Sequence, residues 1–168
     1  SYHATTISAL KRIFGSLSID HRQYEFVEFG AGKGRVLLWA ARHPFLRVTG
    51  VEYSDLLCAV AERNVARISG RREFKAPIAI VCQDAADFEV PSTPCVFYFY
   101  NPFSDEIASK VFGRIVAARR SAPRPDVVVW YPDSQNSRSD LPESFGFQLL
   151  RRFTVRDAWG ANRDVFVL

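Results

Sequence analysis

Long apolar runs, methionine and cysteine are scarce in this sequence, and each scarcity excludes a class of protein. The longest apolar stretches, such as 95–100 and 127–131, are far shorter than the ~20 residues needed to span a bilayer. We therefore expect a soluble protein with no membrane partner. No methionine occurs, even at position 1, so we expect the native N-terminus and any targeting segment to lie outside this sequence.

The three cysteines do not form a recognisable metal or disulfide pattern. Cys58, Cys82 and Cys95 are an odd number, lie in apolar surroundings and contain no C-x-x-C pair. The spacing therefore supports neither a zinc site nor a disulfide scaffold. We expect reduced thiols and a cytoplasmic protein, because disulfides are rare in that compartment.

The remaining composition is that of one folded domain. The 168 residues are 48% hydrophobic, 14% aromatic and 24% charged, which excludes disordered, collagen-like and coiled-coil chains. Chains of this length hold one core, so residues 1–168 are predicted to form a single domain. The net charge of +4 is mild for a nucleic-acid-binding protein.

Short apolar runs alternate with helical patterns, and this order is typical of parallel βαβ units. The strands are expected at 24–29, 47–52, 78–82, 95–100 and 127–131, followed by an antiparallel hairpin formed by 147–156 and 163–168. Residues 133–144 are expected to form a loop or one short helix. The predicted fold is α/β, with a doubly wound, mostly parallel seven-stranded sheet. Residues 24–168 form its Rossmann-like core, and an amphipathic stripe within 1–23 forms a helical cap or lid.

The sharpest local signal is a strand that ends in Glu28 and runs into a turn with glycine at positions 30, 32 and 34. Glycine suits such a turn because a backbone without Cβ can bend tightly and let a ligand lie against it. A dinucleotide site requires G-x-G-x-x-G, and here Arg35 stands where that pattern needs its third glycine. A P-loop is excluded because the sequence contains no G-x-x-x-x-G-K-S/T.

The pattern E-x-G-x-G-x-G resembles motif I of class I S-adenosylmethionine-dependent methyltransferases, and the resemblance extends from about residue 24 to the end. It implies that S-adenosylmethionine is the cofactor, with S-adenosylhomocysteine as the product. It places Glu28 near the methionine end of the cofactor, Glu52 on the ribose hydroxyls and Tyr53 along the adenine. The remaining residues that the resemblance assigns to the cofactor are Gly30, Ala31, Gly32, Gly34, Asp84, Ala85 and Asn101.

A second resemblance concerns the end of the fourth predicted strand. Asn101-Pro102-Phe103 is similar to the N-P-P-Y or N-P-P-F motif IV of amino-group methyltransferases. The similarity implies that the Asn101 side chain and the Pro102 carbonyl orient an amine, and that Phe103 stacks on the substrate. One proline stands where the enzymes that act on adenine in nucleic acids have two, which argues against an adenine substrate.

Overall the sequence resembles small bacterial members near the Dot1-like and seven-strand protein lysine methyltransferases. Tyr2-His3-Ala4-Thr5 is similar to a Tyr-x-Pro-Thr segment that folds over the cofactor carboxylate, which implies cofactor contacts for Tyr2 and Thr5. The histidines share no motif, so none is predicted as a catalytic base, and no metal is expected.

The leading hypothesis is methyl transfer to an amine nitrogen of a protein lysine or a small molecule, without a metal or a covalent intermediate. A second hypothesis is a non-catalytic cofactor-binding module or a partner subunit of another protein. A third is an RNA or DNA base methyltransferase, although no basic cluster beyond 71–72 and 151–152 favours nucleic acid. The sequence does not indicate an oligomeric state.

Overall fold

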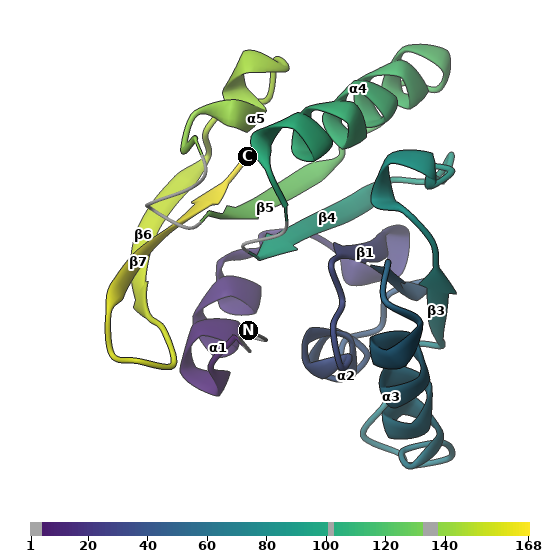
Figure 1. Cartoon of the computed structure of the whole chain (residues 1–168). Coiled ribbons are helices and arrows are strands. Elements are labelled where there is room, and N and C mark those ends of the chain that lie inside the picture. The colour runs from purple at the N-terminus through teal and green to yellow at the C-terminus, as the bar shows by residue number, and fades with distance from the viewer. Residues whose placement is uncertain (1–4, 101–102, 133–137) are drawn as a thin grey trace.

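The computed structural model describes residues 5–100, 103–132 and 138–168, which form a seven-stranded sheet between two layers of helices (Figure 1). The strand order is β3-β2-β1-β4-β5-β7-β6. Strands β1 to β5 pair in parallel, whereas β7 runs antiparallel to β5 and β6. The predicted fold class is therefore confirmed, including the C-terminal hairpin. The strands are β1 (Glu25–Phe29), β2 (Val48–Glu52), β3 (Ile78–Cys82), β4 (Cys95–Tyr100), β5 (Val127–Tyr131), β6 (Arg151–Arg156) and β7 (Asn162–Val167).

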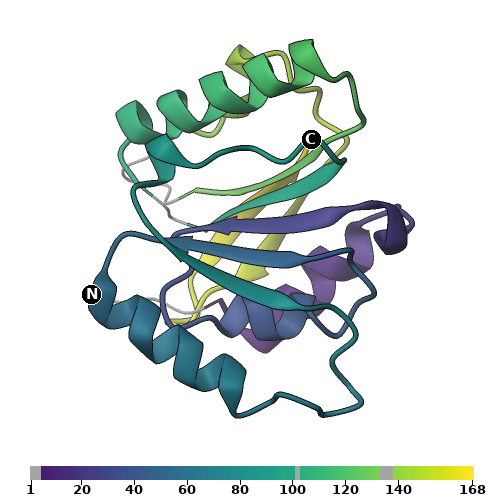
Figure 2. The same ribbon diagram turned by 90° about the vertical axis from the view of Figure 1, so that its right-hand side faces the viewer.

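The helices divide between the two faces of the sheet. Helices α1, α2 and α3 cover one face, and α4 with the short α5 covers the other (Figure 2). The α-helices are α1 (Ile7–Ser16), α2 (Arg35–Ala40), α3 (Asp55–Ala66), α4 (Asp105–Ser121) and α5 (Leu141–Ser144), and the 3₁₀ turns are η1 (His21–Gln23) and η2 (Ala85–Asp87). Of the segment predicted as a loop or short helix, residues 133–137 lie outside the described residues.

The core has two halves, one on each face, because the central strands are buried on both sides. In β4, Val96 and Tyr98 point to the layer that contains α1 and α2, whereas Phe97 and Phe99 join the half beneath α4. This burial on both faces explains why the sequence of the strand is continuously apolar and does not alternate between apolar and polar residues.

The N-terminal stripe forms helix α1, which docks on a strand far away in the sequence. Leu10, Ile13 and Phe14 are buried in the same half of the core as β1 and β4. On the outside, the Arg12 guanidinium donates to the carbonyl of Thr154 in β6 at 2.9 Å. Helix α1 thereby extends the layer of α2 toward the C-terminal hairpin.

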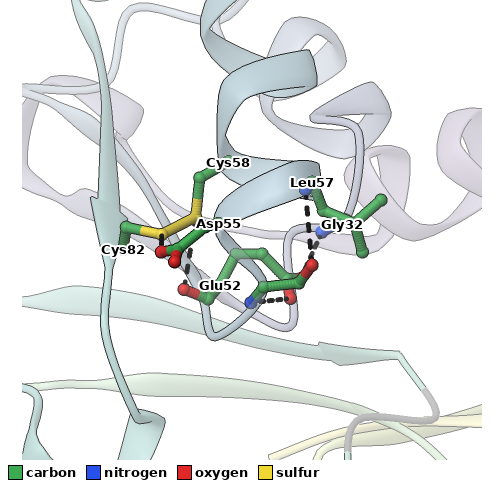
Figure 3. The surroundings of a disulfide bond; sticks show 7 residues. Gly32, Glu52, Asp55, Leu57, Cys58 and Cys82 are labelled. Atoms are coloured by element: carbon green, nitrogen blue, oxygen red, sulfur yellow. Dashed lines mark hydrogen bonds between the residues drawn. A yellow bond between two sulfur atoms is a disulfide. The ribbon is translucent and has the colours of Figure 1, made fainter.

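The cysteine prediction is wrong for one pair, because Cys58 and Cys82 are joined by a disulfide (Figure 3). They are 24 residues apart in the sequence, and their Cα atoms lie 6.0 Å apart. Cys58 lies in the first turn of α3, and Cys82 ends β3 beside Glu52 of β2. The β2-α3-β3 crossover brings the two residues to one edge of the sheet, and no local spacing motif records that proximity. Cys95 is free and buried.

In the described ranges we find no helix with the length and apolarity that a membrane crossing requires.

Candidate functional site

The turn after β1 has the backbone geometry that its glycines predict. Gly30, Gly32 and Gly34 have φ angles of 79°, 55° and 83°, in the left-handed region that side chains with a Cβ rarely adopt. The N–H groups of Gly30 and Ala31 both donate to the Val51 carbonyl, at 2.8 and 3.1 Å. The turn is therefore fixed to the end of β2.

A fourth glycine, which lies outside the predicted motif, supports this turn. Gly50 lies in the middle of β2, and a Cβ at this position would collide with Leu37 and come within 2.8 Å of the Ala31 Cβ. A glycine inside a buried strand often marks such a close approach. That signal was present in the sequence and could have identified Gly50.

Glu52 connects the glycine turn to the start of α3. Its Oε2 accepts a hydrogen bond from the Gly32 N–H at 2.8 Å, and its Oε1 accepts one from the Ser54 N–H at 3.0 Å (Figure 3). Ser54 in turn caps α3 by accepting from the Leu57 N–H. A carboxylate oxygen has two acceptor sites, so each oxygen can also accept from a ligand hydroxyl. The carboxylate is thus held in place by the backbone that a ligand would contact.

Glu28 lies in a very different environment at the end of β1. It is only 4% exposed, and its Oε2 has no hydrogen-bond partner among the described residues. Burial raises the pKa of this carboxyl well above its ordinary value, and the charge of Glu52 raises it further. A buried, unpaired carboxyl oxygen calls for an explanation. A ligand that brings a donor or a positive charge would supply one.

Tyr98 of β4 pairs with Glu28 of β1, and the tyrosines that end β4 and β5 lie near Tyr98. The hydroxyls of Thr5 and Tyr98 lie 3.1 Å apart, and both residues are buried. Burial raises the pKa of Tyr98 well above its ordinary value, and it also raises the pKa of Tyr131. These phenols therefore keep their protons and can donate. Thr5 was predicted as a cofactor contact, whereas the sequence analysis did not single out the tyrosines.

Tyr131 and Tyr100 are paired at the ends of β5 and β4. Their ring centroids are 4.6 Å apart, and the buried Tyr131 hydroxyl has no partner among the described residues. Tyrosines at alternate positions 98 and 100 of a buried strand were visible in the sequence. They point to a polar end of that strand, where the hydroxyls line the α1 side of the sheet.

The third group of predicted residues follows β3. The Gln83 N–H donates to the Glu52 carbonyl at 3.0 Å, so this turn lies beside the Glu52 loop. Asp84 Oδ1 accepts from the Ala86 N–H at 2.8 Å, and Ala85 is buried. Tyr53 is 79% exposed, which leaves its ring open to solvent.

The acceptor motif is only partly described. Asn101, Pro102 and Tyr2 lie outside the described residues, so their predicted roles stay predictions. Phe103 is half-buried and packs against the core half beneath α4. His21 and His43 stack on each other with ring centroids 5.0 Å apart, at the end of the sheet where β1 begins.

The residues at this edge suit a ligand with hydroxyls and a positive charge. Glu52 offers acceptors, and the glycine turn offers backbone close to the ligand. Glu28 offers a buried carboxyl whose Oε2 has no partner among the described residues. Among the described residues, no group of three His, Cys, Asp or Glu side chains is placed to hold a metal ion. In other α/β proteins with an open sheet, ligands bind at the carboxyl ends of the strands, which is the edge described here.

Comparison with known proteins identifies the fold. No family model and no curated protein matches the sequence. The structure is similar to magnesium protoporphyrin IX methyltransferase from Synechocystis with bound S-adenosylhomocysteine, at a TM-score of 0.66 and 12% identity, over 95% of this chain and 79% of that chain. It is also similar to precorrin-6y C5,15-methyltransferase from Geobacter metallireducens, at 0.66 and 13%, over 98% and 91%.

The same fold occurs in an enzyme of another kind. The cyclase SpnF matches at a TM-score of 0.66 and 14% identity, over 88% of this chain and 59% of that chain. The chain therefore has the class I methyltransferase fold, and the site must decide the reaction.

Proposed function

We propose that this chain is an S-adenosylmethionine-dependent methyltransferase that acts on an amine nitrogen. The observation that carries the proposal is the placement of Glu52, whose carboxylate accepts from Gly32 of the glycine turn and from Ser54 of the next loop. This position at the end of β2 suits a carboxylate that accepts from two ribose hydroxyls. The binding of S-adenosylhomocysteine by a structural neighbour supports the choice of cofactor.

Different residues of this chain would bind different parts of the cofactor. Glu52 takes the ribose, the backbone of 30–34 lies against the methionine part, and Tyr53, Asp84 and Ala85 surround the adenine. Glu28, whose buried Oε2 has no partner in the described part of the chain, faces the ammonium group at the methionine end. Tyr2 and Thr5 close over the carboxylate.

The cofactor supplies a methyl group on a sulfonium sulfur, and the chain positions the acceptor. The Asn101 side chain and the Pro102 carbonyl accept the N–H hydrogens of the amine, so its lone pair points at the methyl carbon. As the new N–C bond forms and the S–C bond breaks, the sulfur keeps the electron pair and the amine releases a proton to water. Phe103 packs beside the acceptor. No strong base is required, because the neutral amine is itself the nucleophile.

The substrate class within this proposal is a protein lysine or a small-molecule amine. The cytoplasmic location stays a prediction, and the disulfide between Cys58 and Cys82 removes the argument from reduced thiols on which it was based. The resemblance to Dot1-like enzymes motivates the lysine and stays a prediction. A cell lysate labelled with tritiated S-adenosylmethionine and this protein tests the acceptor. If protease treatment removes the label, the acceptor is a protein amine. If nuclease treatment removes it, the result supports the base methyltransferase. Cofactor binding without any labelled product supports the non-catalytic module.

The cofactor site itself is tested by calorimetry with S-adenosylhomocysteine. We expect Glu52→Ala to weaken binding by about 1–3 kcal/mol, because two hydroxyl hydrogen bonds to a charged acceptor are lost. Glu62→Ala is the matched control, since Glu62 is an exposed acid on α3. Equal affinity of Glu52→Ala and Glu62→Ala would remove Glu52 from the site.

The acceptor motif is tested by Asn101→Ala once a substrate is identified. We expect this variant to lose methyl transfer far more than cofactor affinity, since orienting the amine acts on the chemical step. Full turnover would assign the Asn-Pro turn a structural role instead.

A further inference from the structure

The disulfide joins two segments that border the proposed cofactor site. Cys58 belongs to the first turn of α3, directly after the Ser54 cap that Glu52 holds. Cys82 ends β3 and is followed by Gln83 and Asp84, the turn assigned to the adenine. The cross-link thus fixes the distance between the ribose side and the adenine side of the site (Figure 3).

The two sulfurs differ in access. Cys82 is exposed, whereas Cys58 is 4% exposed. The Asp55 carboxylate lies 3.3 Å from Cys82 Sγ, which disfavours negative charge on that sulfur. Cys58 Sγ lies 3.4 Å from the Glu52 carbonyl oxygen, so neither sulfur has surroundings that favour negative charge. Access decides the order: an external thiolate attacks the exposed Cys82, and Cys58 is the leaving sulfur.

The same surroundings also accommodate two thiols. Cys58 Sγ lies 3.4 Å from the Glu52 carbonyl oxygen, and Cys82 Sγ lies 3.3 Å from Asp55 Oδ1. A disulfide sulfur carries no proton, so these oxygens can accept a hydrogen bond from the cysteines only after reduction. The two sulfurs then separate to van der Waals contact, and each thiol has an acceptor close by.

We propose that Cys58 and Cys82 form a reversible thiol–disulfide site that controls cofactor affinity, with an external dithiol as the reductant. The dithiol's thiolate attacks Cys82 Sγ, the bond between the two cysteine sulfurs breaks, and its electron pair goes to Cys58, which takes a proton from water. The second thiol of the reductant then attacks its own sulfur in the mixed disulfide and releases Cys82, which is protonated. The protein gains two electrons and two protons, and the dithiol leaves as its disulfide.

The effect on cofactor affinity rests on the proposed function. Strand β3 is at the edge of the sheet, so its last residue has a neighbouring strand on one side within the described residues. The bridge holds the Gln83–Asp84 turn against α3 before the cofactor arrives. After reduction the turn keeps the hydrogen bond from the Gln83 N–H to the Glu52 carbonyl but loses the covalent bridge. The cofactor must then restrict the freedom that the turn gains, and we expect S-adenosylhomocysteine to bind about 2- to 10-fold more weakly.

The experiment uses the full chain in both redox states. Cysteines are alkylated under native conditions before and after treatment with dithiothreitol, and mass spectrometry maps the labelled residues. Calorimetry then measures S-adenosylhomocysteine affinity for the oxidised and reduced forms. We expect new labelling at Cys82, reversal by glutathione disulfide, and weaker binding in the reduced form. The Cys58→Ser/Cys82→Ser variant should lose the redox response, and Cys95→Ser, at the buried free cysteine, should keep it.

The outcomes separate the two proposals. Protein that never forms the bridge, or that releases it only when denatured, overturns the exchange site. Reversible exchange with equal affinity in both forms overturns the control of binding and leaves the methyltransferase proposal standing. Reversible exchange in a protein that binds no S-adenosylhomocysteine in either form overturns the proposed function and the control of binding together, and the exchange site stands.

Discussion

At the scale of single residues, Glu28 and Glu52 show how one functional group serves two purposes at one site. Glu52 accepts two backbone hydrogen bonds, which hold its carboxylate in a fixed orientation. Glu28 is fully enclosed, and one of its oxygens has no partner in the described part of the chain. Its raised pKa means that the free protein holds this carboxyl in its neutral form above the pH at which an exposed glutamic acid ionises.

We expect the affinity for S-adenosylhomocysteine to rise with pH. The ammonium of the ligand favours the ionised carboxylate and lowers the pKa of Glu28 in the complex. Binding then releases a proton, so affinity increases between the pKa in the complex and the higher pKa in the free protein. Calorimetry at several pH values, in buffers of different ionisation enthalpy, measures the number of protons released.

Glu28→Gln is the variant that tests this coupling. The amide keeps the shape of the side chain and cannot ionise, so the proton release assigned to Glu28 should disappear and binding should weaken. The free energy of unfolding near neutral pH should stay equal or increase, because the variant no longer buries an ionisable group. Unchanged proton release in Glu28→Gln would assign the pH dependence to another group.

At the scale of elements, the sequence predicts local structure well and long-range packing poorly. Strands β3, β4 and β5 have the predicted boundaries, because each is an apolar run between turn residues. Ser54 and Ser104 cap α3 and α4, and such a cap is encoded locally because it is defined within four residues. The disulfide depends on the β2-α3-β3 crossover, and no local pattern encodes that contact. At Gly50 the glycine in a buried strand signals a close approach, but it does not identify Leu37 and Ala31 as the partners.

We expect Gly50→Ala to destabilise the protein by about 1–3 kcal/mol, as overpacking of a tight core does. The added methyl collides with Leu37 and pushes against Ala31, so the glycine turn must shift. Urea unfolding measures the stability, and S-adenosylhomocysteine binding should weaken in parallel because Ala31 lies in the proposed site.

Gly113→Ala is the matched control for this substitution. Gly113 lies within α4, where an added Cβ meets no atom within 4 Å. The same change should therefore stabilise the protein by about 0.4–1 kcal/mol. Alanine lowers the conformational entropy of the unfolded chain and has a higher helix propensity than glycine. A loss of stability at Gly113 as large as that at Gly50 would contradict the packing argument.

At the scale of the whole molecule, the site is assembled from segments far apart in the chain, and one of them is held by the C-terminal hairpin. The sequence could predict that β1, β2 and β3 end at one edge, because parallel strands require it, and so Glu28, Glu52 and Asp84 are found there. It could not predict that Thr5 reaches Tyr98, because this contact depends on α1 docking beside β6. The Thr6 hydroxyl donates to the Arg156 carbonyl at 3.1 Å, across almost the whole length of the sequence.

This docking bears on whether residues 1–23 form a lid that opens or a part of the core. Leu10 is 1% exposed and packs in the same half of the core as Phe26 and Tyr98, whereas Ile7 on the same helix is 55% exposed. We expect Leu10→Ala to lower the free energy of unfolding by about 2–5 kcal/mol and Ile7→Ala to change it by less than about 0.5 kcal/mol.

If α1 unfolds only with the rest of the domain, its amides should show hydrogen-exchange protection equal to that of β4. Leu10→Ala should lower both protections equally. Exchange of the α1 amides through a local opening of much lower free energy would instead identify α1 as a separable lid. Its opening would then expose Tyr98 without unfolding the sheet.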